Sequence, residues 1–497
     1  MSEDSPHVRR LTYALITVSV LHALSPLILR GLHSGLGWDE TVYISQIDPH
    51  VPAGQFTAPR ARGLTLLTAP ASLVSGSLYV MRIWMAILSG LGMFLAFLPW
   101  LRVRPRMTVP LAAAIWSGLW LGIYYSFEAM PNQYVAYGAI AATGWLVLAI
   151  CEPERRRSLW YAALAIGFTA LMRPSDSIFV FLPLVAGVMM VQGKALRWRA
   201  TAAGLLSAGL AAGLAEWVVE AYVRFGGPVQ RFHAASAENV GGLHWSLGAE
   251  MRVLAGPILC RGTCQADSAV PYRLWWFALP VAVALGIWVA WRQRRATAYV
   301  LVTAVGLSIA AQYVLAIGYA APRFLEPTYA LLAIPAAEGV LWLWRRAATV
   351  SRPAAIAGLV VLGAGHEAIQ LAALQTNDHR LAIETDRAAL MADYLKDTGS
   401  RQPCWVGGAE AGQIAFLAHC HVLDRRIPVD RQTKGVPATV VVVEPGGATP
   451  PTWSIQSWSA HTLTEHSAVH GWTVWRLNSN DTTAPTTVLG PRYLTPA

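Results

Sequence analysis

The sequence predicts an all-α polytopic membrane protein with a small extracytoplasmic α/β domain near its C-terminal end. Three observations support this fold class. The 497 residues are 55% hydrophobic and only 13% charged, whereas soluble domains contain about 25% charged residues. Apolar runs recur along most of the chain, and many approach the ~20 residues that a membrane-spanning helix needs. Short arginine clusters separate these runs, and such clusters orient a membrane protein.

The N-terminal segment predicts a retained first membrane helix. It is polar and ends in Arg9 and Arg10, directly before the apolar run from Leu11 to Leu29. That run is longer than the core of a signal peptide and lacks a small-x-small cleavage site, so we expect no cleavage.

The apolar runs predict about eleven spans. They cover roughly residues 11–30, 79–101, 108–126, 133–151, 158–172, 177–192, 200–222, 273–291, 298–318, 324–344 and 353–375. Basic clusters occupy every second connection, at 9–10, 102–106, 155–157, 194–199, 292–295 and 345–352. The positive-inside rule makes these connections cytoplasmic. We therefore expect a multi-pass protein of the cell membrane with a cytoplasmic N-terminus and an extracytoplasmic C-terminus.

The net charge of +10 is spread over these connections rather than over one soluble face. This distribution argues against a nucleic-acid partner. Because the cytoplasmic connections are short, we expect the function on the outer side.

The outer connections carry the unusual residues. The first, about 31–78, contains Asp39, Glu40, Arg60 and Arg62, and its later part, Gly63 to Val74, predicts a short helix at the interface. The other outer connections are 126–132, 173–176, 223–272 and 321–324.

The composition becomes that of a soluble domain beyond residue 375, so we divide the chain into a transmembrane domain, 1–375, and an outer domain, 376–497. We expect a helix over Asp378 to Asp397, a strand at Cys404 to Val406, a helix over Glu410 to Ala418, a buried strand at Thr439 to Glu444 and an edge strand at Trp472 to Leu477. The Thr/Pro-rich tail after Asn478 is expected to be loose.

Four of the five cysteines lie on the predicted outer side, as Cys260/Cys264 and Cys404/Cys420. An oxidising compartment permits disulfides in both pairs. A zinc site at Cys260 and Cys264 would lack a second pair of ligands nearby, so we predict no metal site.

Ionisable side chains near the outer membrane face are the candidates for function, because their burial costs several kcal/mol unless they are paired. They are Asp39, Glu40, Glu128, Arg173, Asp176, Glu216, Glu220, Arg323 and Glu326. Acids and arginines at a common depth suit a cavity that binds an anionic lipid head and activates a hydroxyl beside it.

Three short motifs resemble the GT-C superfamily of multi-spanning glycosyltransferases, which use polyprenyl-phosphate-linked sugars. The run Trp38 to Tyr43, with Gln46, is similar to the family's acidic motif in the first outer loop. The run Arg173 to Asp176, followed by 181–184, resembles the "RPT…PL" segment of the dolichyl-phosphate-mannose-dependent mannosyltransferases. Arg323 to Pro327 resembles their "RFLLP" segment, except that Glu326 replaces an apolar residue. The resemblance covers residues 1 to about 375, and bacterial relatives also carry a C-terminal outer domain.

The resemblance implies a transferase that moves a sugar from a polyprenyl phosphate to an acceptor hydroxyl by one inverting displacement. Asp39 is the candidate base, with Glu40 second, because a carboxylate must take the proton of the attacking hydroxyl. Arginines suit the departing phosphate, and the candidates are Arg323, Arg173, Arg60 and Arg62. The candidates for sugar or acceptor binding are Glu128, Asp176, Trp38 and Tyr43.

Several residues have structural alternatives. Asp39 would fit the N-cap of an interfacial helix. Arg173 and Arg323 would fit helix ends, where they cap carbonyls or reach lipid phosphates. Glu216 and Glu220 lie one helical turn apart, and we favour their pairing with Arg224. Glu128 would also fit a solvated loop.

Other functions stay open at this point. The group transferred is either a hexose or another lipid-linked group, such as an aminosugar or a pentose. A lipid or solute transporter is the alternative from another class, although such folds carry internal repeats and charges at the midplane, which we do not find. No cofactor is expected, but the acids have the chemistry to bind a divalent cation. The expected partners are a polyprenyl-phosphate sugar, a lipid, glycan or protein acceptor, and the bilayer.

Overall fold

The computed structural model describes residues 6–104, 106–152, 154–155, 157–262, 264, 266–397, 403–424, 439–445, 463–469 and 472–477. The expected loose tail after Asn478 lies outside these residues. The chain divides into two compact units. The first unit comprises Met1–Leu32, Thr57–Leu66 and Arg82–Asn377, and the second comprises His33–Phe56, Leu67–Met81 and Asp378–Ala497.

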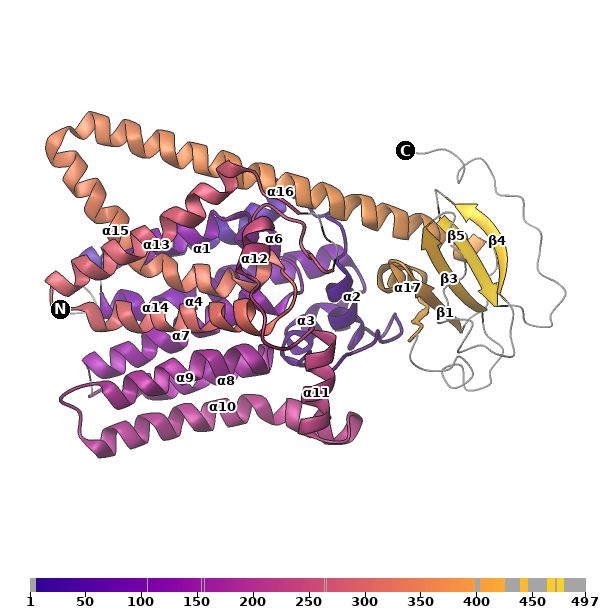
Figure 1. The fold of residues 1–497 in the computed structure, drawn as a ribbon, viewed down its shortest axis with the longest axis horizontal. Coiled ribbons are helices and arrows are strands. Elements are labelled where there is room, and N and C mark those ends of the chain that lie inside the picture. The colour runs from indigo at the N-terminus through magenta and orange to yellow at the C-terminus, as the bar shows by residue number, and fades with distance from the viewer. Residues whose placement is uncertain are drawn as a thin grey trace. The chain divides into compact units, whose positions relative to one another are not determined.

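Most of the described chain is helical (Figure 1). The helices before residue 230 are α1 (Pro6–Leu29), α2 (Trp38–Ser45), α3 (Gly63–Val74), α4 (Leu78–Val103), α5 (Thr108–Ser117), α6 (Trp120–Tyr125), α7 (Pro131–Cys151), α8 (Arg157–Met172), α9 (Pro174–Met190), α10 (Leu196–Arg224) and α11 (Pro228–Glu238). The later ones are α12 (Leu247–Arg252), α13 (Val270–Arg292), α14 (Ala296–Ala316), the 3-10 helix η1 (Pro322–Phe324), α15 (Glu326–Val350), α16 (Arg352–Asp397) and α17 (Ala411–Ala418). The prediction of a short helix over Gly63 to Val74 is confirmed.

The prediction of a mostly helical membrane protein is confirmed. Among the described residues, seven helices are long and apolar enough to cross a membrane: α1, α4, α7, α10, α13, α14 and α16. The other predicted spans fall on shorter apolar helices, α5, α8 and α9, or on α6 and α15. The number of about eleven spans therefore stays a prediction.

The helices of the first unit pack as neighbours. In Figure 1, α7, α8, α9 and α10 run side by side, and the packed pairs include α7 with α8 and α8 with α10. α15 packs against α5, α7, α13 and α14. Glycines allow close approach where helices cross, because a Cβ at Gly286 would lie only 1.9 Å from the carbonyl oxygen of Pro335.

Two predicted element boundaries are wrong. The expected span over 108–126 is broken between α5 and α6, where Leu119 has extended backbone and the Trp120 N–H donates to Gln370 Oε1 at 3.0 Å. Gly118 favours this break through its low helix propensity. The expected helices over 353–375 and 378–397 are one continuous helix of 46 residues, α16.

The second unit contains a five-stranded mixed sheet. Its strands are β1 (Cys404–Gly408), β2 (His421–Val422), β3 (Thr439–Pro445), β4 (Leu463–Val469) and β5 (Trp472–Leu477), in the order β2-β1-β3-β5-β4. β1 pairs in parallel with β2 and β3, while β5 is antiparallel to β3 and β4. β5 is therefore an interior strand rather than the predicted edge strand, because β4, whose polar sequence gave no strand signal, covers that edge.

Both predicted disulfides are present, Cys260–Cys264 and Cys404–Cys420. The second joins the end of α17 to β1 and belongs to the buried core of its unit, together with Ile414, Met391 and Leu395.

Candidate active site

Asp176 lies in the first turn of α9. Its carboxylate is fully buried and accepts hydrogen bonds from the Tyr313 hydroxyl at 2.7 Å and from Gln312 Nε2 at 3.1 Å. Arg173 Nε lies 3.6 Å from the same carboxylate. Asp176 therefore joins α9 to α14. We predicted that Asp176 binds the sugar or acceptor, but these contacts already use much of its hydrogen-bonding capacity.

One aromatic pair brings the two predicted phosphate-binding arginines to the same place. The rings of Tyr313 and Phe324 are stacked with centroids 4.5 Å apart. The guanidinium of Arg173 lies 5.9 Å from the Phe324 ring centroid, and that of Arg323 lies 5.6 Å from it. Cations are attracted to ring faces at such distances, so Phe324 holds both arginines near one another although they are 150 positions apart in the sequence.

Arg323 has a buried acidic neighbour that the sequence analysis missed. Glu250, in α12, is buried, and its Oε1 has no hydrogen-bond partner among the described residues. Burial raises the pKa of the Glu250 carboxyl to about 8, although the nearby Arg323 opposes this rise. Glu250 is thus mainly protonated at neutral pH and places no full negative charge beside Arg323.

Backbone pairing and a disulfide hold Arg323 in place. Arg323 Nη1 donates to the Ile258 carbonyl at 2.9 Å, and its own carbonyl accepts from Asn132 Nδ2 at 2.9 Å. Cys260 pairs antiparallel with Ala320, and it is bonded to Cys264. Ile258 and Cys260, in the connection between α12 and α13, therefore lie beside the Arg323 motif.

Glu128 is not solvated, which corrects one alternative. It is 3% exposed and pairs with Arg30 Nη2 at 2.9 Å. The Arg30 guanidinium also stacks 3.9 Å from the Tyr124 ring centroid. Arg30 was not singled out in the sequence, because it stands at the end of an apolar run where a snorkelling arginine is ordinary.

Tyr125 lies at the centre of these groups. Its electrostatic neighbours include Glu128, Arg323 and Glu326. The Tyr125 hydroxyl is buried and has Arg323 as a hydrogen-bonding neighbour, whereas Asn132 Oδ1 and both carboxyl oxygens of Glu326 are buried without a hydrogen-bond partner among the described residues. Buried polar groups are normally hydrogen-bonded. We refer to Tyr125, Glu128, Asn132, Arg323 and Glu326 as the Tyr125 cluster, which has donors and acceptors to offer to a polar ligand.

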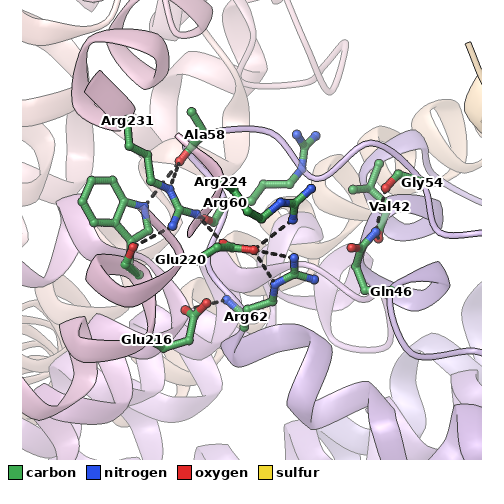
Figure 2. A network of polar contacts seen from close by, with 11 residues as sticks. Val42, Gln46, Gly54, Ala58, Arg60, Arg62, Glu216, Glu220, Arg224 and Arg231 are labelled. Carbon is green, nitrogen blue, oxygen red and sulfur yellow. Dashed lines mark hydrogen bonds and ion pairs between the residues drawn. The ribbon is translucent and has the colours of Figure 1, made fainter. Parts of the chain in front are cut away.

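Arg60 and Arg62, which were also predicted to bind the phosphate, lie in a separate network, shown in Figure 2. Glu220 accepts from Arg62 Nη2 at 2.5 Å, from Arg224 Nη1 at 2.9 Å and from Arg231 Nη2 at 2.8 Å. The Arg231 guanidinium also donates to the Ala58 and Arg60 carbonyls.

This network fixes residues 58–62 against α10 and α11. The expected pairing of Glu220 with Arg224 is confirmed, while Glu216 instead accepts from the backbone N–H of Arg62. Burial lowers the pKa of Arg231, and the Glu220 carboxylate opposes that shift. Arg60 lies 3.6 Å from Glu238 and also donates to the Thr57 hydroxyl, so both Arg60 and Arg62 have partners within the chain itself.

The acidic motif forms α2 in the second unit. Gly37 is the N-cap, and its backbone N–H donates to Glu40 Oε2 at 2.9 Å. The alternative that Asp39 caps the helix is therefore wrong, since Asp39 is the second residue of α2 and Glu40 makes the capping contact. Asp39 is half-buried in the first turn, where the helix dipole favours a carboxylate.

The two aromatic residues of this motif differ in exposure. Trp38 is 42% exposed and lies over Gly412, while Tyr43 is buried and meets the Phe56 ring edge-on. Trp38 therefore keeps a face available to a ligand, whereas Tyr43 belongs to the core of its unit.

The fold has close counterparts among solved structures. ArnT from Cupriavidus metallidurans, bound to undecaprenyl phosphate, matches 96% of this chain and 98% of its own length, with a TM-score of 0.59 and 14% identity. The Archaeoglobus fulgidus oligosaccharyltransferase, tethered to an acceptor peptide, matches 91% of this chain and 69% of its own, with a TM-score of 0.55 and 13% identity.

The chain has the fold of the GT-C membrane glycosyltransferases. The mycobacterial arabinofuranosyltransferase AftD also matches 95% of the chain, with a TM-score of 0.50 and 14% identity, although this chain spans only 40% of AftD. In sequence, the chain matches no family model and no curated protein.

No group of three or more His, Cys, Asp or Glu side chains that could hold a metal ion occurs among the described residues.

Proposed function

We propose that the chain is a membrane glycosyltransferase that moves a sugar from a polyprenyl phosphate to an acceptor hydroxyl on the outer face. The observation that carries this proposal is the Tyr125 cluster, in which an arginine and unpartnered buried oxygens meet within a GT-C fold. The arginine suits the phosphate of the donor, and the oxygens suit the hydroxyls of the sugar and the acceptor.

Arg323 holds the donor phosphate. Its guanidinium can place two parallel N–H groups on phosphate oxygens, and the protonated Glu250 does not compete with a phosphate for it at neutral pH. As the sugar leaves, the phosphate gains negative charge, which a fixed guanidinium stabilises. Arg173, on the same Phe324 ring, supports this charge from the side of α9.

The Tyr125 cluster binds hydroxyls of the sugar or acceptor. Glu326 and Asn132 supply oxygens, and Tyr125 supplies a hydroxyl that donates or accepts. Glu128, held by Arg30, contributes a second carboxylate. Trp38 offers an exposed aromatic face on which a sugar can stack.

Asp39 is the base. It accepts the proton of the acceptor hydroxyl while the oxygen attacks the anomeric carbon and the bond to the phosphate breaks, so that one displacement inverts the anomeric centre. Glu40 is less suited to this role, because its carboxylate already caps α2.

A second candidate function is transfer of a pentose or an aminosugar rather than a hexose. The similarity to an arabinofuranosyltransferase favours a pentose. The two candidates differ only in the ligand of the Tyr125 cluster, so the same assay separates them.

The test is to incubate the purified full chain with polyprenyl phosphates that carry a hexose, a pentose or an aminosugar, with candidate acceptors present, and to measure release of free polyprenyl phosphate. We expect release from one sugar class, and a loss of about 10²- to 10⁴-fold in Asp39→Asn. Glu40→Gln is the matched control. It should lower the stability of α2 but change the rate of polyprenyl phosphate release little. Unchanged turnover in Asp39→Asn would remove Asp39 from the mechanism, and no release from any donor would overturn the proposed function.

A further inference from the structure

A cavity of about 960 Å³ lies at the end of the first unit opposite the Tyr125 cluster. Asp176 is in the first turn of α9, whereas the cavity is lined by Met190, the last residue of the same helix. Tyr313 lies near the end of α14, whereas the cavity is lined by Ala296 and Tyr299 near its start. The positive-inside pattern predicts that this end is cytoplasmic.

The cavity has an apolar part and a basic part. Pro183, Gly187, Met190, Leu301 and Ile334 line the apolar part. The two helices that line it, α9 and α14, also expose large hydrophobic residues, as a surface in contact with lipid tails would. These residues are Ile178, Leu182, Met189, Met190, Val300 and Leu307.

Three arginines line the basic part: Arg104, Arg294 and Arg295. Arg104 is buried and fixed, because its guanidinium donates to Glu338 at 2.9 Å, to Gln293 at 2.7 Å and to the Tyr299 hydroxyl at 2.9 Å. Its Nε has no hydrogen-bond partner among the described residues. Arg294 and Arg295 are exposed in the turn between α13 and α14.

Positive charge is in excess at this end. Burial lowers the pKa of Arg106, and the guanidinium groups of Arg104, Arg295 and Arg345 lower it further. Glu338 is the one acid among these electrostatic neighbours, and it is already bonded to Arg104. An anion at the cavity would relieve the repulsion between these arginines.

We propose that this cavity binds one anionic phospholipid of the leaflet to which it opens. The phosphate would lie among Arg104, Arg294 and Arg295, and the first part of an acyl chain would lie against Gly187, Met190 and Leu301. Basic pockets between membrane helices on the cytoplasmic side bind anionic headgroups for this electrostatic reason. A free phosphate would leave the apolar part empty, and the donor lipid of the proposed function belongs at the other end of the helices. The lipid site does not depend on the proposed function.

Native mass spectrometry of the full chain in detergent tests the proposal, with titration by phosphatidylglycerol, by phosphatidylcholine of the same acyl chains and by undecaprenyl phosphate. We expect one phosphatidylglycerol to be retained in preference to phosphatidylcholine. The double variant Arg294→Asn with Arg295→Gln should weaken this binding about 10- to 30-fold, since each basic residue near an anionic lipid contributes roughly a fivefold effect. Asn is chosen because Arg294 has a φ of 55°, which Asn tolerates better than most residues.

Two further variants distinguish the effect of the arginine charges from the effect of the shape of the cavity. Ala186→Phe fills the cavity beside Gly187 and should reduce binding although every arginine remains. Arg197→Gln with Arg352→Gln removes the same charge from exposed positions of the same predicted side that do not line the cavity, and should keep binding. Equal retention of the two phospholipids would overturn the proposal. So would normal binding in both cavity variants, or retention of undecaprenyl phosphate in place of phosphatidylglycerol.

Discussion

Two buried glutamates on α15 have opposite surroundings. Glu338, twelve residues after Glu326, accepts hydrogen bonds from Arg104, from the Thr108 hydroxyl at 2.7 Å and from the Tyr299 hydroxyl at 3.3 Å. Glu326 is equally buried, but neither of its oxygens has a partner among the described residues. Glu338 joins helices within the protein, whereas the two carboxyl oxygens of Glu326 can accept hydrogen bonds from a ligand.

The partners of a buried ionisable side chain indicate whether it has a structural or a functional role in a membrane protein. A buried ionisable side chain is costly in either case. Where the chain itself supplies its partners, removing it should destabilise the fold. Where the partners are missing, removing it should relieve a cost and instead impair binding of a ligand. The two glutamates therefore predict opposite changes in stability.

The largest expected effect is that of Glu338→Leu. The substitution leaves the buried Arg104 guanidinium without its counter-charge, which should lower the free energy of unfolding by about 3–5 kcal/mol. Thermal unfolding in detergent measures this loss. Adding Arg104→Leu in the same chain should recover most of the stability, and a double variant as unstable as the single one would contradict the ion-pair explanation.

Glu326→Leu should act in the other direction. Replacement of an unpartnered buried carboxyl by an apolar side chain should raise the free energy of unfolding by about 1–3 kcal/mol. Donor turnover should fall at the same time, because the Tyr125 cluster loses two acceptor oxygens. Glu326→Gln, which keeps the size and one carbonyl oxygen, is the control and should retain more activity. A destabilised Glu326→Leu would show that Glu326 is a structural residue like Glu338.

The smallest expected effect is a loss of donor affinity at high pH, caused by ionisation of Glu250. Its folded-state pKa is about 8, above the ordinary value for glutamate, because burial disfavours the charged form. Its contribution to stability is therefore fully present below the ordinary pKa and is lost as the pH rises through about 8. Above pH 8 the ionised Glu250 also competes with the donor phosphate for Arg323. We expect up to about a tenfold loss in donor affinity by pH 9.

Glu250→Gln is the control for this pH dependence. The amide cannot ionise, so the variant should bind the donor equally at pH 7 and pH 9 in an equilibrium binding assay. If the wild type shows the same flat profile, Glu250 does not regulate the charge near Arg323.

Local patterns in the sequence predict much of the molecule. Hydropathy predicts the helices, the short apolar run predicts α3, and the cysteine positions predict both disulfides. The motifs at Arg173 and Arg323 also lead to residues that meet at one aromatic ring. The helices, disulfides and motifs depend on residues close together in the chain, whereas the meeting of Arg173 and Arg323, 150 positions apart, is a result of the fold.

The missed features depend on long-range contacts. Nothing local marks Arg30 as the partner of Glu128 or places Glu250 beside Arg323, because neither pairing has a periodic signal. The break between α5 and α6 depends on Gln370, 250 positions after Trp120. The basic cavity likewise combines arginines that the sequence analysis used only to orient the chain.

The Cys260–Cys264 bond has a consequence for where the protein can mature. It closes a small loop whose first cysteine pairs with Ala320, three residues before the candidate phosphate ligand. A chain kept in a thiol-rich environment would insert its helices and still lack a rigid border on that side of the site. A reductant added to the finished protein should therefore act on ligand binding before it acts on the helices.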